Sequence, residues 1–160
     1  TNLDGITPNT TTVSWNNKYN TTNTNNLSII NLATKSGIMR TESPDQWRWL
    51  QSYLENQSKH NILINMDKNI WDKNNSLKGT KENELLHKIL KDFVAETGKN
   101  VIVASAVSDK TNVSVKDGVR YITLNGLTNS DPNNLNNYKY LKIRATENDL
   151  KYEICNVYNN

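Results

Sequence analysis

Three short runs dense in aliphatic residues mark the first two thirds of the chain. They lie at residues 27–33, 61–66 and 100–104. Dense apolar runs of this length are typical of strands that are buried on both faces of a parallel sheet. Two amphipathic stretches separate the runs. The resulting order of strand, helix, strand, helix and strand predicts parallel pairing through right-handed crossovers.

The first amphipathic stretch begins with a recognisable helix start. Ser43 is placed to cap the helix, Pro44 occupies its first position, and Gln46 completes the pattern of a capping box. An apolar stripe then follows along one side, formed by Trp47, Leu50 and Leu54. We expect a helix over residues 44–57.

The second amphipathic stretch has apolar residues at helical spacing between Leu85 and Val94, and Gly98 suits the position after the last turn. Beyond Ser105 the pattern changes to alternation of apolar and polar positions, interrupted by turn residues. The alternating segments are 113–115, 119–124, 138–145 and 150–158. Alternation predicts strands with one buried and one solvated face, as in antiparallel sheets.

These patterns predict one α/β domain over residues 27–160. Its sheet is expected to be partly parallel, with two crossover helices, and either to be continued by antiparallel C-terminal strands or to have a second sheet packed on it. Residues 1–26 are rich in Asn and Thr, whose side chains compete for backbone hydrogen bonds, so we expect a linker or irregular lead-in there. Residues 12–15 are a candidate edge strand within it.

Composition and charge narrow the classes of partner. The net charge is +3, and no run of basic residues is interleaved with aromatic ones, so no nucleic-acid partner is expected. No apolar stretch approaches the roughly 20 residues needed to cross a bilayer, so no membrane insertion is expected. The single Cys155 has no second cysteine with which to form an intramolecular disulfide.

Candidate site residues follow the predicted parallel strands, because ligands of such sheets bind beyond the carboxyl ends of the strands. Asp67 and Lys68 follow the second run, and Ser105 and Asp109 follow the third. Each aspartate is interpreted either as part of a site or as the cap of a turn.

Aromatic and histidine residues supply few further candidates. Trp49 and Trp71 are candidates for stacking against a sugar ring. His60 and His87 share no ligand spacing, so we predict neither a metal site nor a catalytic residue.

Several motifs resemble those in the second half of calcineurin-like metallophosphoesterases. The run at residues 45–50, Asp-Gln-Trp-Arg-Trp-Leu, is similar to the QxxWL helix of that family. The resemblance places Asp67 where the family has a metal-ligand histidine. It places Val107 and Asp109 at the two ligand positions of the Gly-His-x-His motif, and residues 117–122 on the strand that follows.

The resemblance is degenerate, because valine cannot bind a metal and the ligand motifs of the family's first half are missing. It implies a noncatalytic accessory domain of a secreted or cell-surface bacterial protein, similar to domains at the C-terminal end of exported clostridial proteins. Such a domain would have no cofactor and would bind cell-wall glycopolymer or a neighbouring domain of the same polypeptide.

Two alternatives remain open at this stage. The chain is either a fragment of a metal-dependent phosphoesterase or phosphodiesterase whose other ligands lie upstream, or a purely structural surface module. In the first case Asp67 and Asp109 would complete a site for a hard divalent ion such as Mn²⁺ or Ca²⁺.

Overall fold

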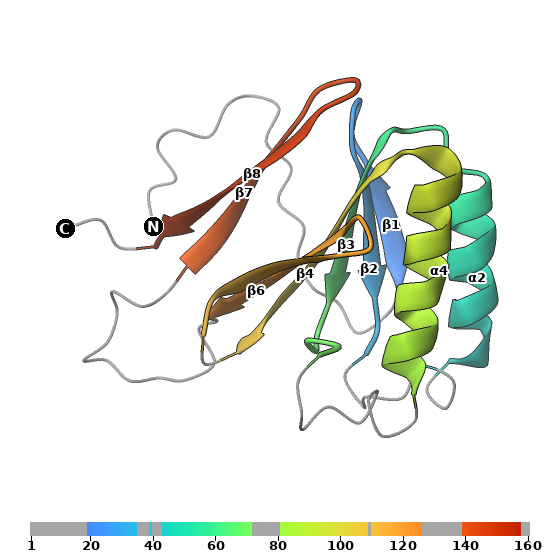
Figure 1. Cartoon of the computed structure of the whole chain (residues 1–160), viewed down its shortest axis with the longest axis horizontal. Coiled ribbons are helices and arrows are strands. Elements are labelled where there is room, and N and C mark those ends of the chain that lie inside the picture. Colours follow the sequence, from blue (N-terminus) through green and yellow to red (C-terminus); the bar gives the residue numbers. More distant parts are fainter. Residues whose placement is uncertain are drawn as a thin grey trace.

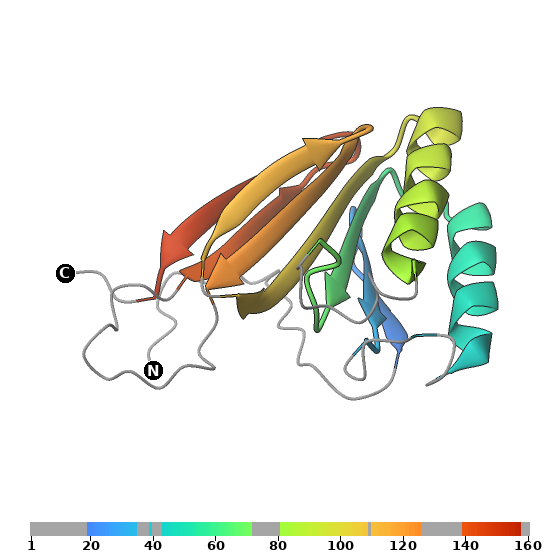
Figure 2. The ribbon, with the colours of Figure 1, turned by 60° about the horizontal axis from the view of Figure 1, so that its bottom comes forward.

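The computed structural model describes residues 19–34, 39, 43–71, 81–108, 110–125 and 139–157, with the backbone alone for 106–108. These residues form an α/β fold whose main sheet is largely parallel (Figure 1). Figure 2 shows the helices on one side of the sheet and a β-hairpin on the other, which makes three layers.

In the part of the chain that is described, six strands form the main sheet in the order β1-β2-β3-β4-β6-β5. Its parallel strands are β2 (Ser28–Leu32), β3 (Asn61–Met66), β4 (Asn100–Ser108) and β6 (Val119–Asn125). Antiparallel strands form its two edges, β1 (Asn20–Asn23) and β5 (Asn112–Lys116). The parallel pairing that the apolar runs predict is therefore confirmed.

The remaining elements cover the two faces of this sheet. Helices α2 (Pro44–Glu55) and α4 (Glu82–Thr97) pack on one face. The strands β7 (Lys139–Ala145) and β8 (Leu150–Asn156) do not continue the main sheet, as one prediction had it, but pair with each other as a separate antiparallel hairpin that packs on the other face. The central strand β3 is accordingly buried on both faces, with Ile62, Ile64 and Met66 under the helices and Leu63 under the hairpin.

Residues 119–124, which the alternation predicts as an antiparallel strand, pair antiparallel with β5 on one side and parallel with β4 on the other. The cause is the order of the strands. After β4 the chain forms β5 at the edge of the sheet, one position away from β4, and β6 then fills the position between them. A tight turn at Asp117 and Gly118 makes this return, with φ of 50° and 80°. Positive φ at both central residues matches the right-handed twist of a hairpin and favours the Asp-Gly pair.

The first predicted helix has a different start from the expected capping box. Ser43 stands at the N-cap, but its side chain makes no capping hydrogen bond. The Gln46 side chain instead reaches the end of β2, where Ala33 donates its N–H to Oε1 at 2.8 Å and accepts from Nε2 at 3.1 Å. The prediction of a capping box is therefore wrong, because the side-chain amide of Gln46 hydrogen-bonds with the end of β2 and not with the start of its own helix.

Other boundaries differ less from expectation. Helix α2 ends at Glu55, and Gly98 ends α4 with φ of 66° as predicted. Strand β1 lies inside the segment expected to be an irregular lead-in, because its residues pair antiparallel with β2. The candidate strand at 12–15 lies outside the described residues.

Candidate functional site

The carboxyl ends of β2 and β3 are joined by a reciprocal pair of hydrogen bonds. Thr34 donates its backbone N–H to Oδ2 of Asp67 at 3.2 Å, and Asp67 donates its N–H to Oγ1 of Thr34 at 3.1 Å. Thr34 is fully buried and Asp67 is half-buried. The carboxylate of Asp67 thus fastens two strand ends together, which is the turn-capping interpretation of this residue.

The other predicted site residues contribute less to this edge. Lys68 is exposed. Ser105 is buried in β4, where it pairs with Met66, the residue that precedes Asp67 in the chain. Asp109 lies outside the described residues, as does the side chain of Val107. Among the described residues, the structure therefore brings the carboxylate of Asp67 to Thr34.

A buried carboxylate that the sequence analysis misses lies at the start of α4. Glu82 accepts the backbone N–H of Met39 through Oε2 at 2.8 Å, and its side chain is almost completely buried. Nothing in the local pattern distinguishes Glu82 from the exposed acidic residues of a helix start, because its partner is 43 residues earlier in the chain.

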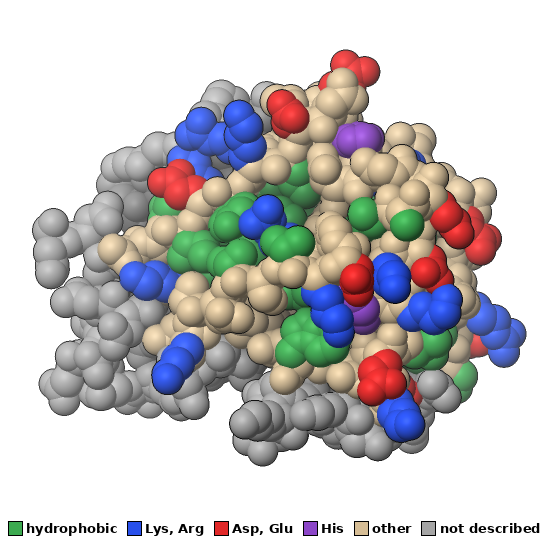
Figure 3. All heavy atoms as spheres, in the orientation of Figure 1, with side chains coloured by type: hydrophobic (Ala, Val, Ile, Leu, Met, Phe, Trp, Pro, Cys, Tyr) green, Lys and Arg blue, Asp and Glu red, His purple; other side chains and the backbone are tan. Residues whose placement is uncertain are grey.

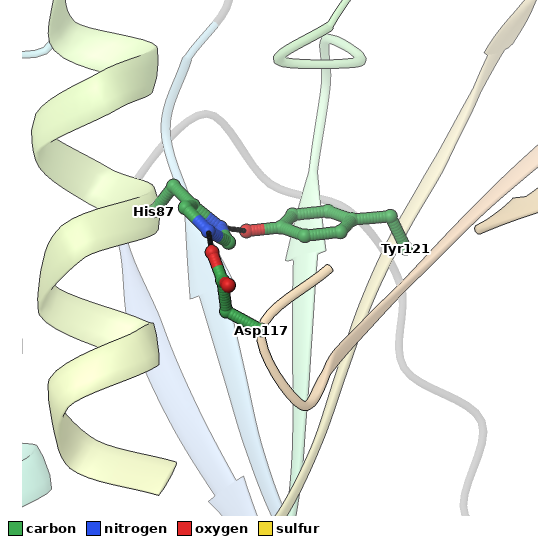
Figure 4. Close-up of polar contacts among 3 residues, drawn as sticks. All are labelled: His87, Asp117 and Tyr121. Carbon is green, nitrogen blue, oxygen red and sulfur yellow. Dashed lines mark hydrogen bonds and ion pairs between the residues drawn. The ribbon is translucent and has the colours of Figure 1, made fainter. Parts of the chain in front are cut away.

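A polar cluster that joins three elements is centred on His87 (Figure 4). His87 lies in α4 and is 6% exposed, and its two ring nitrogens have different partners. Nδ1 lies 2.6 Å from the hydroxyl of Tyr121 in β6, and Nε2 lies 2.7 Å from Oδ2 of Asp117 in the β5–β6 turn. The cluster thus joins the helix to the sheet and to the turn that re-enters it.

Electrostatics indicates where the protons of this cluster lie. The hydrogen bond from His87 lowers the pKa of Asp117, with help from Lys91 and Lys116, so Asp117 accepts. Burial, reinforced by the charge of Asp117, raises the pKa of Tyr121 well above its ordinary range, so its hydroxyl keeps the proton. The Nε2–H of His87 therefore donates to the carboxylate of Asp117.

A carboxylate, an imidazole and a hydroxyl follow one another as in a catalytic triad. The positions of these groups here fit a structural role better than a catalytic one. A nucleophile must be reached by its substrate, whereas Tyr121 is 4% exposed and its hydroxyl is engaged with His87. Asp117, by contrast, has 43% of its side chain exposed. The cluster, which we call the His87 cluster, therefore holds α4 to the β5–β6 turn through hydrogen bonds.

Both candidate stacking tryptophans lie in aromatic groups, and the groups are separate. Trp71 stands edge-on to His87 at 5.3 Å and to Tyr121 at 5.2 Å between ring centroids, and the Lys116 ammonium lies 4.3 Å from its ring centre. Trp49 stacks on Tyr53 at 5.7 Å and contacts the ring of Tyr19 at 4.8 Å. Each of these tryptophans thus has ring contacts within the domain.

We expect the Asp117→Asn variant to have a lower free energy of unfolding than the wild type near pH 6, and we expect this difference to disappear as the pH falls. The pKa of Asp117 is lower in the folded state, so its ion contributes stability above the ordinary value of about 3.9, and that contribution disappears as the pH falls through the lowered pKa. Asparagine tolerates the positive φ at this position. Urea unfolding of both proteins between pH 6 and pH 2.5 tests this, and a difference that stays constant would contradict it.

Comparison with known proteins adds no family assignment. No protein-family model matches the chain, and no curated protein matches its sequence. Among the described residues, no helix is long and apolar enough to cross a membrane. The same residues hold no group of three or more His, Cys, Asp or Glu side chains arranged to share a metal ion.

Proposed function

We propose that this chain is a noncatalytic, phosphoesterase-like accessory domain of a secreted or cell-surface bacterial protein. On this proposal the α/β scaffold is kept for its packing, and the domain binds cell-wall glycopolymer or a neighbouring domain of the same polypeptide. The observation that carries the proposal is the reciprocal hydrogen bonding of Asp67 and Thr34 at the strand ends.

Asp67 stands where the resembled family has a metal-ligand histidine, and here its carboxylate has a structural use. A two-metal centre holds a phosphoryl group when each ion has several protein ligands. Val107, at the next ligand position of the resemblance, has no donor atom in its side chain. The donor set at these positions therefore does not fit such a centre, and we derive no catalytic step through a metal.

The test combines metal retention with hydrolysis. The protein is incubated with Mn²⁺, Zn²⁺ and Ca²⁺, dialysed exhaustively and measured by elemental mass spectrometry, and is then assayed against bis(p-nitrophenyl) phosphate. We expect no stoichiometric retention and no hydrolysis above that of buffer.

The Asp67→Asn variant makes this test interpretable, because asparagine keeps an oxygen that can accept from Thr34. Asp109→Ala is measured beside it. Stoichiometric metal in the wild type that is lost in either variant, together with hydrolysis, would overturn the proposal. That result would favour a fragment of a metal-dependent phosphodiesterase.

A further inference from the structure

The β7–β8 hairpin has one face against the main sheet and an opposite face that carries most of its charge. Its inward residues, which pack on the sheet, are Leu141, Ile143, Ala145, Leu150, Tyr152 and Ile154. Three exposed cations, Lys142, Arg144 and Lys151, belong to the opposite face, because side chains alternate along a strand. In Figure 3, Lys and Arg side chains lie over this region of the molecule.

Two of these cations stand directly opposite each other in the hairpin. The register pairs Arg144 with Lys151, and like charges placed opposite one another on neighbouring strands are destabilising. Neither side chain has an ion pair or a hydrogen bond with another described residue. An anion bound between them would relieve the repulsion.

A shallow depression lies at the same place. It has a volume of about 210 Å³ and is lined by Lys142, Arg144, Lys151, Tyr152 and Glu153. Tyr152 itself packs on the sheet side of the hairpin, where the guanidinium of Arg120 donates to its hydroxyl at 3.2 Å and lies 4.9 Å from the ring centre. The cations of the outer face therefore border the recess, and the strand β8 beneath it is anchored to the main sheet through Tyr152.

We propose that this recess binds one phosphate group of a phosphodiester-linked glycopolymer. A guanidinium offers two parallel N–H donors to phosphate oxygens, and the two ammonium groups add point charges. The inference deepens the proposed function, and rests on it, because it names the polymer that a noncatalytic surface domain would hold.

The surrounding charges favour a sparsely charged, flexible polymer over duplex nucleic acid. Glu153 lines the recess itself, and Glu147 and Asp149 stand at the hairpin turn. These carboxylates would repel the continuous phosphates of a duplex, which carries one charge per roughly 1.7 Å. Tyr140 is 48% exposed on the cationic face, two positions from Lys142, and its ring suits contact with a sugar.

The experiment measures binding by isothermal titration calorimetry with the whole chain. The probes are a poly(glycerol phosphate) chain, inorganic phosphate, single-stranded DNA and neutral dextran. We expect the glycerol phosphate polymer to bind most tightly. The Arg144→Gln/Lys151→Gln double variant is expected to weaken binding at least about tenfold, because charge-assisted hydrogen bonds are lost.

Two further variants distinguish a site from general attraction. Arg48→Gln/Lys81→Gln removes the same charge from exposed positions on the helix side and should leave affinity within about twofold. Glu153→Gln should strengthen binding, because it removes the negative charge in the recess. The double hairpin variant should melt no lower than the wild type, because it removes the Arg144–Lys151 repulsion.

The inference is overturned if both double variants weaken binding equally, if single-stranded DNA or free phosphate binds as tightly as the polymer, or if no anionic probe binds. Each of these outcomes leaves the noncatalytic proposal standing, because metal retention and hydrolysis are measured separately. Hydrolysis of the polymer would instead count against the noncatalytic proposal.

Discussion

Replacing Asn61 by aspartate is expected to lower the free energy of unfolding by about 3–5 kcal/mol, because a carboxylate would be buried against carbonyl oxygens. Asn61 is fully buried at the start of β3. Its Nδ2 lies 3.1 Å from the carbonyl oxygen of Asn26, 2.6 Å from that of Thr146 and 3.1 Å from that of Asp149. This amide therefore helps to hold the hairpin turn on the main sheet.

Asn61→Ala is expected to lower stability less, by about 1–3 kcal/mol, because it leaves carbonyls without a donor but adds no charge. Urea unfolding measures both variants, and Asn148→Asp in the exposed hairpin turn is the matched control, with an expected effect within about 0.5 kcal/mol.

Hydrogen exchange adds a readout specific to the hairpin. In Asn61→Ala the amides of β7 and β8 should exchange faster, while those of β3 should change less, because the lost bonds hold the hairpin turn. Equal stability of the Asn61 and Asn148 aspartate variants would show that the amide does not hold the hairpin.

The second large effect is expected at Gln46, which is fully buried in the first turn of α2. Gln46→Ala should lower the free energy of unfolding by about 2–5 kcal/mol, because both the N–H and the C=O of Ala33 lose their partner and a cavity is left. Urea unfolding followed by circular dichroism measures the change.

Gln51→Ala provides the control for this prediction, because it makes the same substitution in the same helix at an exposed position. Its expected effect is within about 0.5 kcal/mol. If both variants had the same stability, the contact of Gln46 with Ala33 would contribute little to the fold.

Much of the fold is predictable from local patterns. The runs at 61–66 and 100–104 form parallel strands, and the stripe formed by Trp47, Leu50 and Leu54 is the buried side of α2. Gly98 ends α4 where a left-handed residue is required. These predictions succeed because hydrophobic periodicity and the tolerance of glycine for positive φ act within a few residues.

The candidate site is predictable in a more limited way. Asp67 is correctly placed at a strand end, but its partner Thr34 lies 33 residues earlier in the chain. His87 lies between helix apolar positions in the sequence, and its partners, Asp117 and Tyr121, are 30 and 34 residues away. No local pattern predicts these hydrogen bonds, so the His87 cluster can be recognised only from the three-dimensional structure.

Except for β1, the sequence by itself determined which described segments become helices and strands and which faces of them are apolar. It did so because those properties depend on neighbours along the chain. The tertiary structure decided the insertion of β6 between β4 and β5, the packing of the hairpin on the sheet, and the partners of Gln46, Asn61 and His87. These features depend on contacts between distant residues, where burial requires each polar group to find a partner wherever the fold supplies one.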